Sequence, residues 1–267
     1  MTPIRSDTVG QTCEVNGMRM HYRTDGDRAK PCLLLSNSLG TDLSMWDAQA
    51  DALAGDFFVV RYDTRGHGQS ASGSAPFGIG RLGLDVVALL DHLDIARTAF
   101  CGISMGGLTG QWLGIHQPQR LTKLVLANTA ARIGGAAPWQ LRAEQVRCDG
   151  MAAVAGSAAA RWFTPQFLQR APDTVARMVD ALRDQDAGGY AACCEALAQA
   201  DLHACVGTIA VPTLIIVGGH DPVTTIDDGR WLQQQIAGAR LVNLPASHIS
   251  NIEAADLFTE QLRTFLA

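Results

Sequence analysis

Gly-Ile-Ser-Met-Gly-Gly, residues 102–107, contains the pattern G-x-S-x-G with Ser104 at its centre. The apolar run Thr98–Gly102 predicts a strand, and Ser104–His116 predicts a helix that follows it directly. A serine on so tight a strand-to-helix turn takes strained backbone angles and projects its hydroxyl above the sheet, and a Cβ on either flanking glycine would clash with the neighbouring strand and helix. The pattern therefore predicts that Ser104 is a nucleophile. The alternative is a glycine-rich loop in which the serine only caps the helix.

Segments on both sides of this turn alternate between strand-like and helix-like patterns. Continuously apolar runs, typical of buried parallel strands, lie at Cys32–Leu35, Phe57–Val60, Leu124–Ala127, Pro212–Gly219 and Arg240–Leu244, with helical patterns at Ile79–Leu93 and Ile249–Leu266. Residues 136–204 differ, because they are rich in alanine, arginine and glutamine and prolines divide them into short helices. This order predicts an α/β protein: residues 1–135 and 205–267 form a doubly wound, mostly parallel sheet, and residues 136–204 form an inserted helical cap.

The composition suits a globular protein and argues against several other classes. With 47% hydrophobic and 18% charged residues, the 267-residue chain can bury a large core. The net charge of −5 comes without a basic cluster, so we expect no nucleic-acid binding. The sequence has no apolar run of about 18 residues, so it predicts no membrane span, and residues 1–15 lack the apolar core of a secretory signal. The seven cysteines, an odd number without a C-x-x-C pair, indicate reduced thiols in the cytoplasm rather than a disulfide framework or a zinc site.

A serine hydroxyl needs an adjacent general base before it can attack at neutral pH. Of the seven histidines, only His248 directly follows the last predicted strand, at the carboxyl edge of the sheet beside Ser104. Asp221 follows the strand PTLIIVGG and reaches the same edge, whereas Asp227 and Asp228 suit a surface helix cap. We predict that Asp221 orients His248 and that His248 activates Ser104, the alternative being a solvent-facing histidine. The chain order serine, aspartate, histidine is typical of the α/β-hydrolase fold.

A serine nucleophile also needs hydrogen-bond donors for the oxyanion that forms at the attacked carbonyl. The backbone N–H of Met105, directly after the nucleophile, is the first expected donor. The second is expected from the loop SNSLG after the strand CLLL, where Asn37 and Ser38 stand in place of the His-Gly pair usual in this fold. Alignment on the glycine of this loop makes Leu39 N–H the second donor, and Ser38 the alternative one residue earlier.

Five segments resemble those of the bacterial 3-oxoadipate enol-lactone hydrolases, or β-ketoadipate enol-lactonases. They are SNSLGTDLSMWD (36–47), YDTRGHGQS (62–70), GISMGG (102–107), GGHDPVT (218–224) and ASHISNIE (246–253). The RGHG and GHD parts occur widely in the α/β-hydrolase superfamily and support the fold, whereas SNSLGTDLSMW points to this family. The resemblance implies hydrolysis of 3-oxoadipate enol-lactone in the catabolism of aromatic compounds, with a small lactone as the partner and without a metal or organic cofactor.

The substrate that the resemblance implies is a five-membered lactone with a free carboxylate, which should bind a cation. Arg132, just after the last strand before the cap, is the first candidate, and Arg147 and Arg161 in the cap are alternatives. Trp139 is expected to line the pocket from the cap. The competing interpretations are that the arginine is only solvated at the surface and that the tryptophan only packs the cap onto the core.

Two other functions fit the same sequence. A carboxylesterase or carbon–carbon bond hydrolase would keep the triad and differ in the cap, and a ligand-sensing receptor would keep the triad but signal through a partner. A large apolar patch on the cap would favour the receptor, and the alanine- and arginine-rich cap shows none. The sequence does not fix the oligomeric state.

Overall fold

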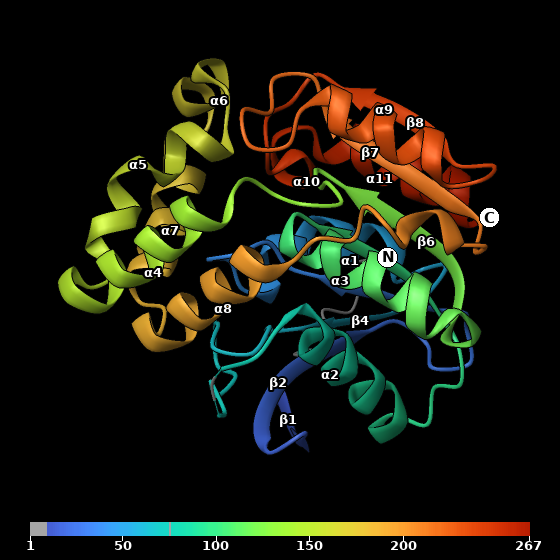
Figure 1. Cartoon of the computed structure of the whole chain (residues 1–267). Coiled ribbons are helices and arrows are strands. Elements are labelled where there is room, and N and C mark those ends of the chain that lie inside the picture. The colour runs from blue at the N-terminus through green and yellow to red at the C-terminus, as the bar shows by residue number, and fades with distance from the viewer. Residues whose placement is uncertain (1–9, 75) are drawn as a thin grey trace, which may run out of the picture.

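The computed structural model describes residues 10–74 and 76–267, which form one eight-stranded sheet in the order β1-β2-β4-β3-β5-β6-β7-β8 (Figure 1). The strands are β1 Gln11–Val15, β2 Met18–Asp25, β3 Cys32–Ser36, β4 Phe58–Tyr62, β5 Thr98–Ile103, β6 Leu121–Ala127, β7 Thr213–Gly218 and β8 Arg240–Leu244. β1 and β2 pair antiparallel, as do β2 and β4, and all other neighbours are parallel. The predicted mostly parallel sheet is confirmed.

Helices cover both sides of this sheet (Figure 1). They are α1 Asp47–Leu53, α2 Ile79–His92, α3 Met105–His116, α9 Ile226–Gln235, α10 Ser250–Glu253 and α11 Ala255–Leu266, with short 3-10 turns η1 Leu43–Trp46, η2 Pro118–Arg120 and η3 Val206–Thr208. α2 packs on α3, α3 packs on β5 and β6, and α1 packs on α11. In α2, Leu82, Val86, Leu89 and Leu90 are buried at helical spacing, which is the apolar stripe that predicted this helix.

Two features of the fold differ from the predictions. β1 and β2 form an N-terminal hairpin that the sequence analysis did not predict, joined by Asn16 and Gly17 with φ of 46° and 75°. Two successive positive φ values are typical of the tight Asn-Gly turn between strands, so this dipeptide was the missed signal. The predicted final helix is divided in two, because Ala254 between α10 and α11 has φ −122° and ψ 49°, outside the helical region.

Between β6 and β7, the described chain forms five α-helices and no strand. They are α4 Ala136–Asp149, α5 Ala152–Trp162, α6 Pro165–Arg170, α7 Pro172–Arg183 and α8 Ala187–Gln199, and they gather at one end of the sheet (Figure 1). We call them the cap. The division into a core of 1–135 and 205–267 and a cap domain of 136–204 stays a prediction.

The cap contacts the sheet domain through backbone at two places. A Cβ built on Gly66 would lie 2.5 Å from Gly189 Cα, so the loop after β4 and the start of α8 touch directly. At the other place, Ile249 N–H donates to Trp162 O at 3.1 Å. These contacts fix the cap above the carboxyl ends of the parallel strands.

The remaining expectations concern the whole chain. Within residues 10–74 and 76–267, no helix combines the length and apolar character needed to cross a bilayer. All seven cysteines are free thiols, at positions 13, 32, 101, 148, 193, 194 and 205. The segment examined for a secretory signal begins with residues 1–9, which lie outside the described residues.

Candidate active site

The Ser104 turn lies at the carboxyl end of β5, where α3 begins. Ser104 has φ 57° and ψ −113°, which a non-glycine residue rarely adopts. Its N–H donates to Ala127 O at 3.0 Å, and Thr129 Oγ1 donates to its carbonyl at 2.9 Å, so β6 and the residues after it hold the strained serine in place. The backbone strain predicted from the sequence is confirmed.

Two glycines make room for this turn. A Cβ on Gly102 would lie 2.1 Å from Gly106 O, and a Cβ on Gly106 would lie 2.4 Å from Ser36 O on β3. Both obstacles are backbone atoms of packed elements, so they cannot move aside as a flexible side chain can. The steric reason predicted for the two glycines is confirmed.

We expect Gly106→Ala to lower the free energy of unfolding by about 1–3 kcal/mol, the usual effect of overpacking a buried site. Gly156→Ala is the matched control, because Gly156 lies inside α5 and a Cβ there meets nothing within 4 Å. Alanine is the better helix former by about 1 kcal/mol, so the control should be as stable as the wild type or more so. Urea unfolding measures both variants. A Gly106→Ala protein as stable as the wild type would contradict the close approach of α3 to β3.

His248 and Asp221 form a buried pair at the same edge of the sheet. His248 lies between β8 and α10, and Asp221 follows β7. His248 Nδ1 lies 2.8 Å from Asp221 Oδ2, and the two side chains have exposed fractions of 4% and 0%. Because Nδ1 faces the carboxylate, Nε2 is the nitrogen left for another partner, and His248 lines the same cavity as Ser104. The structure therefore brings the three predicted residues to one place.

The Asp221 carboxylate is held by donors on both oxygens. Oδ2 accepts from Asn128 Nδ2 at 3.0 Å and from Thr224 Oγ1 at 2.8 Å, besides His248. Oδ1 accepts from the N–H groups of Val223 at 2.7 Å and Thr224 at 3.1 Å. Burial alone would raise the pKa of Asp221, but the charge and hydrogen bond of His248 and the bonds from Asn128 and Val223 outweigh it and lower that pKa. The carboxylate therefore stays ionised and oriented.

Of the two predicted oxyanion donors, Leu39 lines the cavity, and Met105 directly follows the cavity residue Ser104. Met105 is the first residue of α3, and Leu39 lies in the loop after β3. In the part of the chain that the structure describes, neither N–H donates to a backbone carbonyl, which leaves both free for a ligand. Ser38, the alternative, also lines the cavity with Leu39. The oxyanion role of Leu39 and Met105 stays a prediction.

A cavity of about 260 Å³ lies between the sheet edge and the cap. Ser104, His248 and Leu39 line it from the sheet side. The cap contributes mostly apolar and aromatic side chains, namely Pro138, Trp139, Trp162, Leu182 and Tyr190, together with two arginines. Trp139 thus lies where the sequence placed it. Among residues 10–74 and 76–267, no group of three or more His, Cys, Asp or Glu side chains is placed to hold a metal ion.

The arginines are arranged differently from the expectation. Arg132 does not line the cavity: its Nη1 lies 3.5 Å from Asp201 Oδ2, and its side chain is 39% exposed. The bond from Leu202 N–H to Ala131 O holds Asp201 beside Arg132, which explains this outward direction. The prediction that Arg132 binds the substrate carboxylate is therefore corrected.

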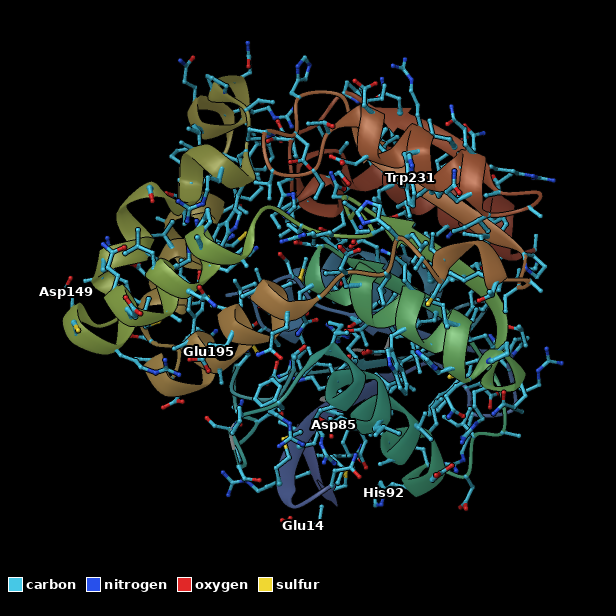
Figure 2. The ribbon with its side chains drawn as sticks, viewed as in Figure 1. Glu14, Asp85, His92, Asp149, Glu195 and Trp231 are labelled. Carbon is cyan, nitrogen blue, oxygen red and sulfur yellow. The ribbon has the colours of Figure 1, made fainter. Side chains whose placement is uncertain are left out.

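The two alternative arginines have different surroundings. Arg147 pairs with Glu195 on α8 at 2.5 Å, and both side chains are partly exposed to solvent. Figure 2 labels Glu195 on α8. Arg161 lines the cavity, and so does Arg142. Of the candidates weighed from the sequence, only Arg161 has the right position.

The sequence analysis missed two residues of this site. Arg142 lies three residues after Trp139 on α4, so the two share a helix face, and its guanidinium lies 4.7 Å from the Trp139 ring centroid. Placing Trp139 in the pocket was therefore enough to predict Arg142 there. Asn128, which donates to Asp221, directly follows β6 at the carboxyl edge of the sheet. A polar residue at this edge is the sequence signal that could have predicted its place in the site.

Comparison with known proteins agrees with this geometry. Residues 31–255 match the family described as the alpha/beta hydrolase fold. The chain is 48% identical to 3-oxoadipate enol-lactonase 2 of Acinetobacter baylyi, over 96% of each chain, and 42% identical to enol-lactonase 1 of that organism, over 94% of each. The crystal structure of the enol-lactonase from Burkholderia xenovorans is similar with a TM-score of 0.94 and 49% identity, covering 96% of this chain and 99% of that one. The chain therefore belongs to the α/β-hydrolase fold family and, within it, to the 3-oxoadipate enol-lactonases.

Proposed function

We propose that this protein hydrolyses 3-oxoadipate enol-lactone to 3-oxoadipate. One observation carries the proposal: the cavity that holds Ser104 and His248 also holds Arg142 and Arg161. Within residues 10–74 and 76–267, neither arginine is paired with a carboxylate of the protein. An ester-cleaving centre beside two cations that lack a carboxylate partner suits a small lactone that carries a carboxylate, and the names of the relatives agree. The seven free thiols support the expectation of a reducing, cytoplasmic location.

In the first half of the reaction, Ser104 Oγ attacks the lactone carbonyl carbon and gives its proton to His248 Nε2. The negative charge passes to the carbonyl oxygen, where the N–H groups of Leu39 and Met105 receive it. Asp221 keeps the proton of the imidazole on Nδ1 and stabilises the imidazolium. When the carbonyl re-forms, the ring C–O bond breaks and its electron pair leaves as an enolate.

In the second half, the enolate takes the proton from His248 and becomes a ketone. Water then gives a proton to His248 Nε2 while its oxygen attacks the acyl carbon. The Ser104 C–O bond breaks, and the serine oxygen takes that proton back. The linear product, whose ring opened when the enolate left, is released with a new carboxylate, and the protein returns to its starting state.

The two arginines suit the carboxylate that the lactone already carries. Burial lowers the pKa of the Arg161 guanidinium, and the like charge of Arg142 lowers it further. A bound carboxylate would relieve the repulsion between these cations and would replace the water lost on binding. Each charge-assisted hydrogen bond contributes about 1.5–3 kcal/mol.

We expect Arg161→Ala and Arg142→Ala each to lower kcat/KM for the enol-lactone at least about tenfold, the equivalent of about 1.4 kcal/mol. Hydrolysis of a neutral aryl ester should change little, because that substrate has no carboxylate to bind. Arg132→Ala is the matched control, since Arg132 pairs with Asp201 outside the cavity, and it should leave both substrates unaffected. Steady-state kinetics on the two substrates measure the contrast. Equal losses on both substrates would assign the cavity arginines a structural role instead.

The same kinetics separate the competing functions. A carboxylesterase would turn over the neutral aryl ester with a higher kcat/KM than the enol-lactone. A carbon–carbon bond hydrolase would cleave a diketone that carries a carboxylate and leave the lactone intact. A receptor would bind the lactone without turnover. Lactone hydrolysis by the wild-type chain with a kcat/KM above that for the aryl ester excludes all three alternatives.

A further inference from the structure

His67 lies in the loop after β4, outside the predicted triad, and contacts the loop that carries Leu39. Its Nε2 is 2.9 Å from Gly40 N, and its Nδ1 is 3.2 Å from Arg65 O. A carbonyl oxygen can only accept and a backbone N–H can only donate, so the proton is on Nδ1 and the lone pair is on Nε2. The residue is 1% exposed, so both ring nitrogens are buried and need these hydrogen-bond partners.

The loop from Asn37 to Asp42 lies between β3 and η1, and hydrogen bonds hold it and the first residue of η1 to the end of β4 and the loop after β4. Asn37 Nδ2 donates to Tyr62 O at 2.9 Å, and Leu43 N–H donates to Asp63 Oδ1 at 2.8 Å. Between these two anchors, Ser38 O, which belongs to the same peptide as Leu39 N–H, accepts from Thr41 Oγ1 at 2.9 Å and from Thr41 N–H at 3.3 Å. The next peptide, between Leu39 and Gly40, is held by the bond from Gly40 N–H to His67. Gly40 has φ +80°, so the chain reverses there in a conformation that other residues rarely adopt. Thr41 therefore holds the peptide of Leu39 N–H from within the loop, and His67 holds the adjacent peptide from outside the loop.

We propose that His67 is a positioning residue for the oxyanion hole: by accepting the Gly40 N–H, it anchors the turn that Thr41 closes and so keeps the Leu39 N–H directed toward the carbonyl oxygen of the substrate. The proposal deepens the proposed function and rests on its assignment of Leu39. It concerns the acyl-transfer chemistry and not the recognition of the carboxylate.

The surroundings of His67 keep its imidazole neutral. Burial is the dominant influence and lowers the pKa of His67, although the Arg65 carbonyl and the carboxylates of Asp63, Asp42 and Asp186 act against it. From the cap, the Tyr190 ring lies 6.1 Å from the imidazole, centroid to centroid. An imidazolium would set N–H against the Gly40 N–H and break the bond, so the neutral form is the one that can hold the loop.

The test compares His67→Leu with His67→Gln. Loss of one oxyanion donor costs about 10²–10³ in kcat, so His67→Leu should lower kcat by about 10² with KM changed less than about threefold. The glutamine Oε1 can accept a hydrogen bond near the position of Nε2, so His67→Gln should recover at least about tenfold of that loss. Titration of the reactive serine with a fluorophosphonate corrects kcat for any misfolded fraction. A glutamine variant as slow as the leucine variant, or a loss that appears in KM alone, would overturn the proposal.

Two further measurements keep the test independent of folding and of substrate identity. Nitrogen-15 NMR of the wild-type protein should show the Nε2 of His67 unprotonated at neutral pH, and a protonated Nε2 would overturn the proposal without any variant. Both variants are also assayed on a neutral aryl ester, which needs the same oxyanion hole. If the enol-lactone is not the substrate, the wild-type chain fails on the lactone while the ester still reports the effect of His67.

Discussion

Ser104→Ala lowers kcat for the enol-lactone by about 10⁴-fold or more, because the covalent route is lost and only binding and oxyanion stabilisation remain. Alanine at φ 57° carries the same Cβ as serine, so we expect the turn and the fold to persist. Circular dichroism and thermal unfolding check this, and kcat is measured with enough enzyme to detect slow turnover.

The double variant Ser104→Ala with His248→Ala distinguishes the mechanism. Residues that act as one unit give losses that do not add, so the double variant should be little slower than Ser104→Ala alone. Losses that multiply would mean that His248 still acts without Ser104, as it would if it activated water directly. That outcome would replace the acyl-enzyme route by direct attack of water.

Asp221→Asn lowers kcat by about 10⁴-fold, because it reverses the direction of a hydrogen bond. Oδ2 of Asp221 accepts from His248 Nδ1, Asn128 Nδ2 and Thr224 Oγ1, while Oδ1 accepts from two backbone N–H groups. Asparagine keeps its carbonyl on the side of the backbone donors and therefore turns its NH₂ toward His248. The imidazole then keeps its proton on Nε2, where it cannot accept one from Ser104.

Asp227→Asn is the matched control for this change. Asp227 lies on α9, pairs with Arg230 at the surface and was one of the acids weighed from the sequence. We expect its replacement to leave kcat unchanged. If Asp227→Asn is as slow as Asp221→Asn, the acid has been assigned wrongly.

Asp221→Asn also changes how the free energy of unfolding depends on pH below neutrality. Despite burial, which acts to raise it, folding lowers the pKa of Asp221 below its ordinary value, chiefly because His248 lies beside it. The ionised carboxylate therefore stabilises the protein above the pKa of the unfolded state, and this contribution is lost as the pH falls through the lower folded pKa. Asp221→Asn has no such group to titrate. Urea unfolding between neutral pH and about pH 3 should therefore show a steeper loss of stability in the wild type than in the variant.

The sheet and the predicted triad could be read from the sequence because each depends on a short local pattern. The strand–G-x-S-x-G–helix run restricts the backbone so tightly that few other conformations fit, and the parallel strands bring Asp221 and His248 to the edge where Ser104 lies. The direction of Arg132 could not be read in this way. It depends on Asp201, which is distant along the chain and becomes a neighbour only after the cap has packed.

The cavity side of the cap was harder to predict for the same reason. Arg161 comes from α5, and nothing in its local sequence distinguishes it from a partly solvated arginine such as Arg147 on α4. Which helix face turns toward the sheet depends on contacts between helices, notably of α4 with α8. Trp139 was the one exception, since a large aromatic residue marks the buried face of its helix.

The direct contact of Gly66 with Gly189 limits how new specificities can be engineered into this scaffold. A cap transplanted from another hydrolase must carry glycine at position 189, because a Cβ there would lie 2.5 Å from Gly66 Cα and would lift α8. Tyr190, the next residue of that helix, would then move away from both His67 and the cavity. Libraries that vary the cavity-facing residues of α4 and α5 but keep the contact of Gly66 with Gly189 can therefore change which carboxylate-bearing side chain of the lactone is accepted. Turnover should be retained in such variants.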